Sequence, residues 1–130
     1  MIAAWAASLM LAALAAADTP PEARRLFETR QTDLVLLADR LGGLHRLNQV
    51  CPDYGNITVF RDSMRAVIEG ERPVRTTREA MIKAFNEAYA DMANRHGTCS
   101  ADAEAAFRRE ARAAAAIVDR LSRGMGDPPS

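Results

Sequence analysis

Several features that mark common functional classes are missing from this sequence. The chain has 17 basic and 17 acidic residues, a formal net charge of zero and no strongly basic block. Such a chain lacks the electrostatic attraction by which proteins bind DNA and RNA, so no nucleic-acid partner is expected. The only tryptophan, Trp5, lies in an N-terminal apolar run, which excludes a tryptophan-lined ligand pocket in the rest of the chain.

Signatures of common enzyme classes are also missing. The sequence contains no GxSxG, HExxH, P-loop or GxGxxG motif. No residue is therefore assigned a catalytic role, and no cofactor is expected. An enzyme would have to assemble its site from residues that lie far apart in the chain, so a non-enzymatic function is favoured.

The N-terminal segment predicts export. Residues 1–17 are uncharged and rich in alanine, and Asp18 is the first ionisable residue. An apolar run that ends in small residues is typical of a secretory signal peptide, although no lysine or arginine precedes this one. The alternative is a short membrane anchor, but the run only reaches the lower length limit for crossing a bilayer. We predict cleavage after about Ala17, a periplasmic location and no stable membrane insertion afterwards.

The rest of the chain shows helical periodicity. After a polar lead-in segment (18–31), apolar residues recur every three or four positions in four stretches, at about 32–50, 57–69, 77–96 and 101–123. The first stretch places five leucines on one face: Leu34, Leu37, Leu41, Leu44 and Leu47. Four consecutive helices with short connections predict an all-α fold, a small antiparallel four-helix bundle at 32–124, followed by a disordered tail at 125–130.

Two helix starts have candidate caps. Ser100 stands directly before the fourth stretch, where its hydroxyl would accept a hydrogen bond from a free backbone N–H. Thr76 and Glu79 fit a capping box for the third stretch. The fourth stretch is expected to bury Ala103, Phe107, Ala114, Val118 and Leu121.

Cys51 and Cys99 are the only cysteines. In an up-down-up-down bundle, the end of the first helix and the connection between the third and fourth helices lie at one pole, as a disulfide requires. A redox pair or a zinc site with His45 and His96 is the alternative. On a helix, however, the six residues from His45 to Cys51 give a rotation of about 240° and a rise of about 9 Å. We therefore predict one structural disulfide and no metal site.

Four polar residues are candidates for binding or burial: His45, Asn86, Tyr89 and His96. His45 is expected to be half-buried and hydrogen-bonded to a neighbouring helix. His96 would end the third helix, where its charge favours the helix dipole. Asn86 lies beside an apolar face and would either hydrogen-bond to another helix or be solvated.

Gly42 and Gly43 interrupt the first helical stretch, although each costs about 1 kcal/mol relative to alanine inside a helix. Our hypothesis is that they make room for a large side chain, with Tyr89 as the candidate. The alternative is a kink that divides the helix.

Four motifs occur in a characteristic order. They are LGGLHRL at 41–47 leading to Cys51, FRDSM at 60–64, AFNEAY at 84–89, and Cys99 with the helix that follows it. Together they span about 34–122 and resemble a family of small exported proteins of alphaproteobacteria, known only as a domain of unknown function. The resemblance implies export and a Cys51–Cys99 pair, and it implies no activity.

These observations predict an exported periplasmic helical protein, a non-enzymatic interaction module whose partner is an envelope protein. The alternative is a small-ligand-binding bundle with a pocket near His45, Asn86 and Tyr89. A pocket lined by His45 and Tyr89 would favour a ligand. A filled core with an exposed apolar patch would favour a protein partner.

Overall fold

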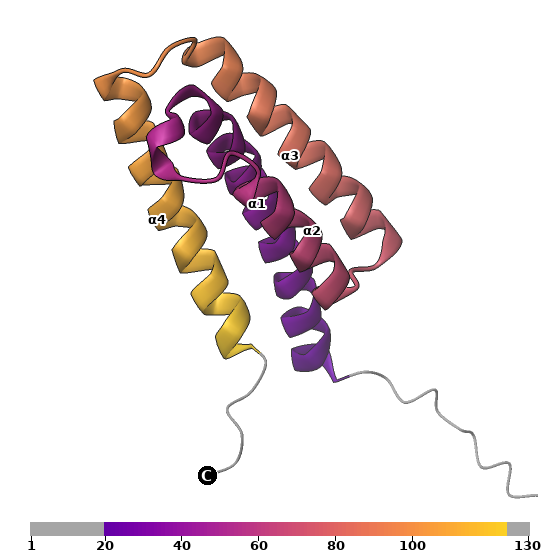
Figure 1. Cartoon of the computed structure of the whole chain (residues 1–130). Coiled ribbons are helices and arrows are strands. Elements are labelled where there is room, and N and C mark those ends of the chain that lie inside the picture. The colour runs from indigo at the N-terminus through magenta and orange to yellow at the C-terminus, as the bar shows by residue number, and fades with distance from the viewer. Residues whose placement is uncertain (1–19, 125–130) are drawn as a thin grey trace, which may run out of the picture.

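The computed structural model describes residues 20–124, so the predicted signal peptide (1–17) and the predicted tail (125–130) lie outside the described residues. The described chain forms four α-helices: α1 (Pro21–Val50), α2 (Val59–Glu71), α3 (Arg75–Arg95) and α4 (Ala101–Arg123), with a short 3-10 helix, η1 (Pro52–Tyr54), after α1. Successive helices run in opposite directions (Figure 1). The predicted all-α antiparallel bundle with one disulfide is confirmed.

The first helix is longer than the periodicity predicts. It begins at Pro21, so most of the predicted polar lead-in segment is helical. Proline suits the first turn because its φ is already helical and its missing N–H would have no partner there. Residues 21–29 are all exposed, so this part of α1 carries no apolar stripe that periodicity could detect.

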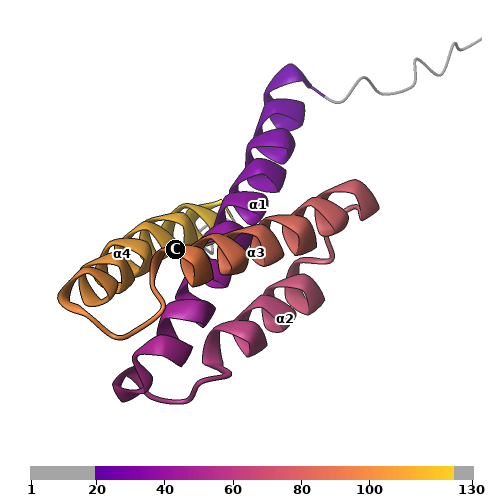
Figure 2. The same ribbon diagram turned by 90° about the horizontal axis from the view of Figure 1, so that it is seen from above.

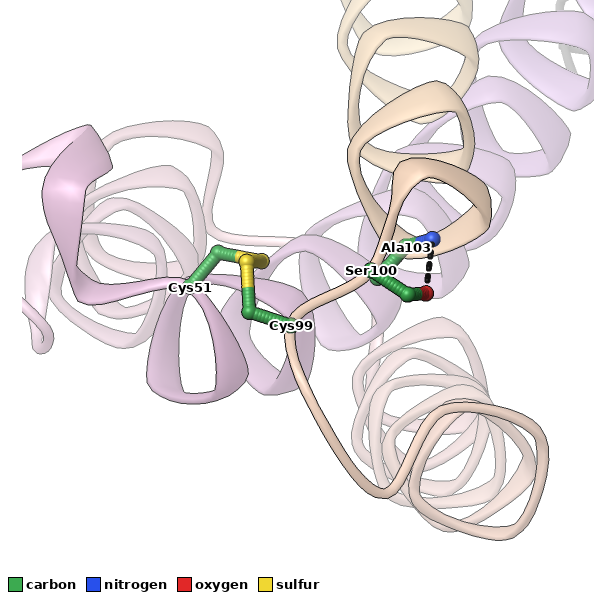
Figure 3. Close-up of a disulfide and its surroundings, with 4 residues drawn as sticks. All are labelled: Cys51, Cys99, Ser100 and Ala103. Carbon is green, nitrogen blue, oxygen red and sulfur yellow. Dashed lines mark hydrogen bonds between the residues drawn. A yellow bond between two sulfur atoms is a disulfide. The ribbon is translucent and has the colours of Figure 1, made fainter.

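The two predicted caps have different outcomes. Ser100 is the N-cap of α4, and its hydroxyl accepts a hydrogen bond from the Ala103 N–H at 3.1 Å (Figure 3). The predicted capping role of Thr76 is wrong, because α3 begins at Arg75 with Val74 as its N-cap. Glu79 instead forms an ion pair with Arg75, one turn earlier on the same helix.

α1 is the central helix of the bundle. It packs against each of the other three helices, most extensively against α3. Viewed from above, α4 and α2 lie on opposite sides of it (Figure 2). The predicted leucine face is confirmed as the core, since these side chains are 6% exposed or less: Leu34, Leu37, Leu41, Leu44 and Leu47.

Gly42 allows α1 and α3 to approach so closely that their main chains are in contact. A Cβ atom at Gly42 would lie 2.1 Å from the carbonyl oxygen of Phe85 and 2.8 Å from its Cα. A Cβ atom at Gly43 would meet the side chain of Met92 at 3.4 Å. The hypothesis of room for Tyr89 is therefore corrected: Gly42 makes room for the main chain of α3. Since α1 runs unbroken through both glycines, they do not divide it.

The buried face of α4 differs from the predicted one. Val118 is 47% exposed, and Ile117 is buried in its place at 5%. Glu110 lies in the same buried face, only 7% exposed, where the sequence pattern gave no apolar residue. Its carboxylate accepts hydrogen bonds from Nη1 of Arg40 on α1, at 2.9 and 3.1 Å.

Two further ion pairs join α1 to its neighbours. Asp33 pairs with Arg120 of α4 at 2.8 Å. Arg30 pairs with Glu71 of α2 and also donates a hydrogen bond to the Leu121 carbonyl oxygen of α4 at 2.8 Å. α1 is thus held to α2 and α4 by polar contacts in addition to the leucine core.

Candidate functional site

The two cysteines lie at one end of the bundle. Cys51 follows α1 and Cys99 lies in the connection from α3 to α4; their Cα atoms are 5.0 Å apart and their sulfur atoms are bonded (Figure 3). The predicted disulfide is therefore confirmed. Both sulfur atoms are used in this bond and are not available as zinc ligands. Within residues 20–124, no group of three His, Cys, Asp or Glu side chains is placed to hold a metal ion.

His45 lies in an aromatic cluster between α1 and α3. Its side chain is only 9% exposed, and its ring centroid lies 5.5 Å from that of Tyr89 and 5.8 Å from that of Phe85. Its Nε2 atom lies 3.4 Å from Nε2 of Gln49 on the same helix. Gln49 also accepts a hydrogen bond from the Tyr89 hydroxyl at 2.6 Å. His45 is more buried than the half-burial that the sequence predicts. The predicted hydrogen bond to a neighbouring helix is wrong, because within residues 20–124 the ring contacts α3 only through the rings of Phe85 and Tyr89.

The environment of His45 favours the neutral imidazole. Burial lowers the pKa of His45, and the positive charge of Arg61 lowers it further. The main chain of Ile57 and the carboxylate of Asp62 act in the opposite direction with smaller effect. The ring is therefore neutral at pH 7 and packs as an aromatic group.

The remaining candidate residues lie in three different places. Tyr89 is half-buried and carries the Arg46 guanidinium over its ring at 5.7 Å from the centroid. Asn86 is exposed and lines a groove between α2 and α3. His96 is the C-cap of α3, as the sequence predicts, and its backbone N–H donates to the Met92 carbonyl. The structure thus brings His45 and Tyr89 together but places Asn86 on a separate surface.

Two surface grooves flank α2. The first, the α2–α3 groove, has a volume of about 410 Å³ and contains both charged and apolar side chains. Its lining residues are Arg61, Met64, Arg65, Ile68, Glu69, Arg78, Ile82, Phe85 and Asn86.

The second, the α2–α4 groove, consists of two adjoining hollows of about 390 and 230 Å³. Both hollows are lined by Leu37, Val67 and Val118, so they form one continuous groove over α1. Its walls consist largely of small residues: Ser63, Ala66 and Gly70 of α2, and Ala111, Ala114, Ala115 and Ser122 of α4.

Each end of the α2–α4 groove has a defined boundary. One hollow reaches Phe60, whose ring packs edge-on against Phe107, while Phe107 stacks on Tyr54 with centroids 3.9 Å apart. The other hollow ends at the Arg30–Glu71 ion pair. The groove between these limits is apolar.

Of the pocket predicted near His45, Asn86 and Tyr89, only Asn86 lines either groove, and the rest of both grooves was not predicted. One signal was present, because Arg61 and Arg65 are four residues apart and share one face of a helix. The contribution of Arg78, on a different helix, follows only from the packing of α2 and α3. The apolar character of the α2–α4 groove was hidden, because alanines on a helix give little periodic signal.

These features define the class of the protein, a small all-α domain closed by one disulfide. A family model described as "Protein of unknown function (DUF2385)" matches residues 30–124, well over half of the chain, and the chain belongs to this family. The match begins at Arg30, the first residue of α1 that is partly buried rather than exposed. No curated protein and no solved structure matches the chain. Among residues 20–124, no helix combines the length and the apolar character that a membrane span requires.

Proposed function

We propose that this protein is an exported, periplasmic, non-enzymatic module that binds a helix of another envelope protein in the α2–α4 groove. Export is supported by the disulfide, since such bonds persist in oxidising compartments, and by the uncharged run at 1–17. The resemblance to exported alphaproteobacterial proteins supports the same location.

The observation that carries the proposal is the apolar groove between α2 and α4. Its floor is formed by the buried leucines Leu37, Leu41 and Leu44 of α1. Its exposed apolar surface lies on the walls, where Ala66, Ala115 and Val118 are exposed, Val118 by 47%. Exposed apolar surface organised as a groove is typical of interaction sites, whereas scattered apolar residues are not.

The shape of the groove favours a helix as the occupant. From Phe60 to Gly70 the α2 wall is about 15 Å long, which corresponds to nearly three turns of a partner helix. Small wall residues such as Ala66 and Ala115 let a helix backbone come close. An amphipathic helix that inserts its apolar face is a common occupant of grooves of this kind.

Site-specific photocrosslinking in the native host tests this proposal. A photoreactive residue at Ala115, which is exposed in the groove, should crosslink to one envelope protein, at an amphipathic helix identified by peptide mapping. The control position is Leu36, which is 43% exposed on α1 and lines neither groove. Val118→Lys should abolish the Ala115 crosslink, and Leu36→Lys should leave it intact.

Three outcomes would contradict the proposal. Equal crosslinking from Ala115 and Leu36 would show that the groove is not selective. A crosslink to a second copy of this chain would assign the groove to self-association. Persistence of the crosslink in the folded Val118→Lys variant would place the partner elsewhere.

Export has its own measurement. The protein recovered from the periplasm should begin at about Asp18, and its mass should rise by two hydrogens on reduction. Free thiols, or a chain that keeps 1–17 in the membrane fraction, would refute this part of the proposal.

A further inference from the structure

The α2–α3 groove has a charge pattern that the α2–α4 groove lacks. Three arginines line it, Arg61, Arg65 and Arg78, against a single carboxylate, that of Glu69. The groove therefore has an excess of positive charge in a chain whose formal net charge is zero. This local excess favours an anionic ligand.

The guanidinium groups of this groove are available for a ligand. Within residues 20–124, neither Arg65 nor Arg78 takes part in an ion pair or a side-chain hydrogen bond. Arg61 lies 3.8 Å from Asp62, but both side chains are about half exposed, so this contact contributes little. By contrast, the Arg40 guanidinium is already paired with the carboxylate of the buried Glu110.

The same groove offers apolar surface directly beside these charges. Met64 is buried, Ile68 and Phe85 are half-buried, and Ile82 is 43% exposed. A purely ionic ligand would leave this apolar surface in water. A purely apolar ligand would leave the guanidinium groups unpaired. A molecule with an anionic head and a hydrocarbon body uses both parts of the groove.

We propose that the α2–α3 groove binds a free single-chain anionic amphiphile, a medium-chain fatty acid, with its carboxylate at the arginines and its alkyl chain along Met64, Ile82 and Phe85. Guanidinium groups suit the carboxylate headgroup of a fatty acid because they form charge-assisted hydrogen bonds with carboxylates. The volume of about 410 Å³ lies at the lower end for ligand pockets, which fits one alkyl chain better than a two-chain lipid. This inference does not rest on the α2–α4 groove or on its partner.

Calorimetric titration of the purified protein with laurate, below its micelle concentration, tests the inference. Affinity should increase along the series octanoate, decanoate and laurate, because each added methylene is removed from water. Acetate, which has the head alone, and dodecanol, which has the tail alone, should both bind much more weakly.

Matched double variants test the location. Arg65→Gln with Arg78→Gln should weaken laurate binding about tenfold, as expected from the loss of two partly exposed charge contacts. Arg109→Gln with Arg112→Gln removes the same charge from exposed positions on α4 and should leave the affinity unchanged. All four side chains are exposed, so both double variants should fold, and circular dichroism verifies this.

Several results would overturn the inference. Equal weakening of laurate binding by the two double variants would show that the affinity depends on net charge and not on the groove. Nuclear magnetic resonance shifts on laurate addition that map to Val118 rather than Ile82 would place the ligand in the other groove. Binding to anionic phospholipid vesicles without binding to free laurate would identify a membrane surface as the ligand.

Discussion

Replacing Gly42 with alanine adds one methyl group at the closest contact between two helices. The new Cβ would lie 2.1 Å from the Phe85 carbonyl oxygen and 2.8 Å from the carbonyl carbon. These are main-chain atoms of α3, so no rotamer change can relieve the contact. Restoring an ordinary separation of about 3.5 Å requires α1 and α3 to move apart by more than about 1 Å at this point.

The expected magnitude follows from two opposing contributions. Separating the helices loosens the core cluster that contains Leu41 of α1 and Met81 of α3, and overpacking of this kind costs about 3 kcal/mol. Alanine regains about 1 kcal/mol through its higher helix propensity. The net loss of about 2 kcal/mol should lower Tm by about 10 °C for a domain of this size.

Thermal unfolding followed by circular dichroism measures this shift, and Gly43→Ala is the matched control. At Gly43 the added Cβ meets only the flexible Met92 side chain, at 3.4 and 3.5 Å. This variant should be neutral or more stable than the native protein by up to about 1 kcal/mol. If Gly42→Ala has the same Tm as Gly43→Ala, the close approach of α1 and α3 does not exist as described.

Three further predictions concern stability and the protonation of His45. Reduction of the Cys51–Cys99 disulfide, which spans 48 residues, should lower the free energy of unfolding by about 4 kcal/mol; urea titrations with and without reductant would coincide if this is wrong. Burial raises the pKa of Asp39 in the folded state, so its ionised form costs stability as pH rises through that pKa. Asp39→Asn should therefore stabilise the protein at pH 7, a gain that disappears below about pH 4, and a constant gain across this range would refute the argument. The pH dependence that His45 contributes has the opposite sign. Its pKa is lowered in the folded protein, so its contribution to stability is fully present above the ordinary histidine pKa of about 6.5. This contribution is lost as the pH falls through the pKa of His45 in the folded state. Arg61→Gln should raise the His45 pKa in a ring-proton titration, and an unchanged pKa would contradict the assigned cause.

The helices and the core could be predicted because their signals are local. Leucines at three- and four-residue spacing mark the buried face of α1, and Ser100 marks the start of α4. The disulfide followed from chain topology, since Cys51 and Cys99 fall at the same end of any up-down-up-down arrangement of these four helices.

The features that failed to be predicted depend on contacts between helices. Gly42 indicated close packing, but only the structure shows that the neighbour is the Phe85 main chain. Glu110 resembled a surface residue because its partner, Arg40, is 70 residues away. The helix before Arg30 was missed for a different reason, since an exposed helical segment buries no periodic apolar face.

The two proposed sites share α2, and adjacent residues of this helix allow them to be separated. Val67 lines the α2–α4 groove, whereas Ile68 lines the α2–α3 groove, and both side chains are half-buried. Val67→Ser and Ile68→Ser therefore carry comparable costs to the fold while changing different surfaces. Val67→Ser should weaken the Ala115 crosslink and leave laurate binding intact, and Ile68→Ser should do the reverse. Loss of both activities in each folded variant would mean that the substitutions displace α2 itself, and the two grooves could not then be treated as independent sites.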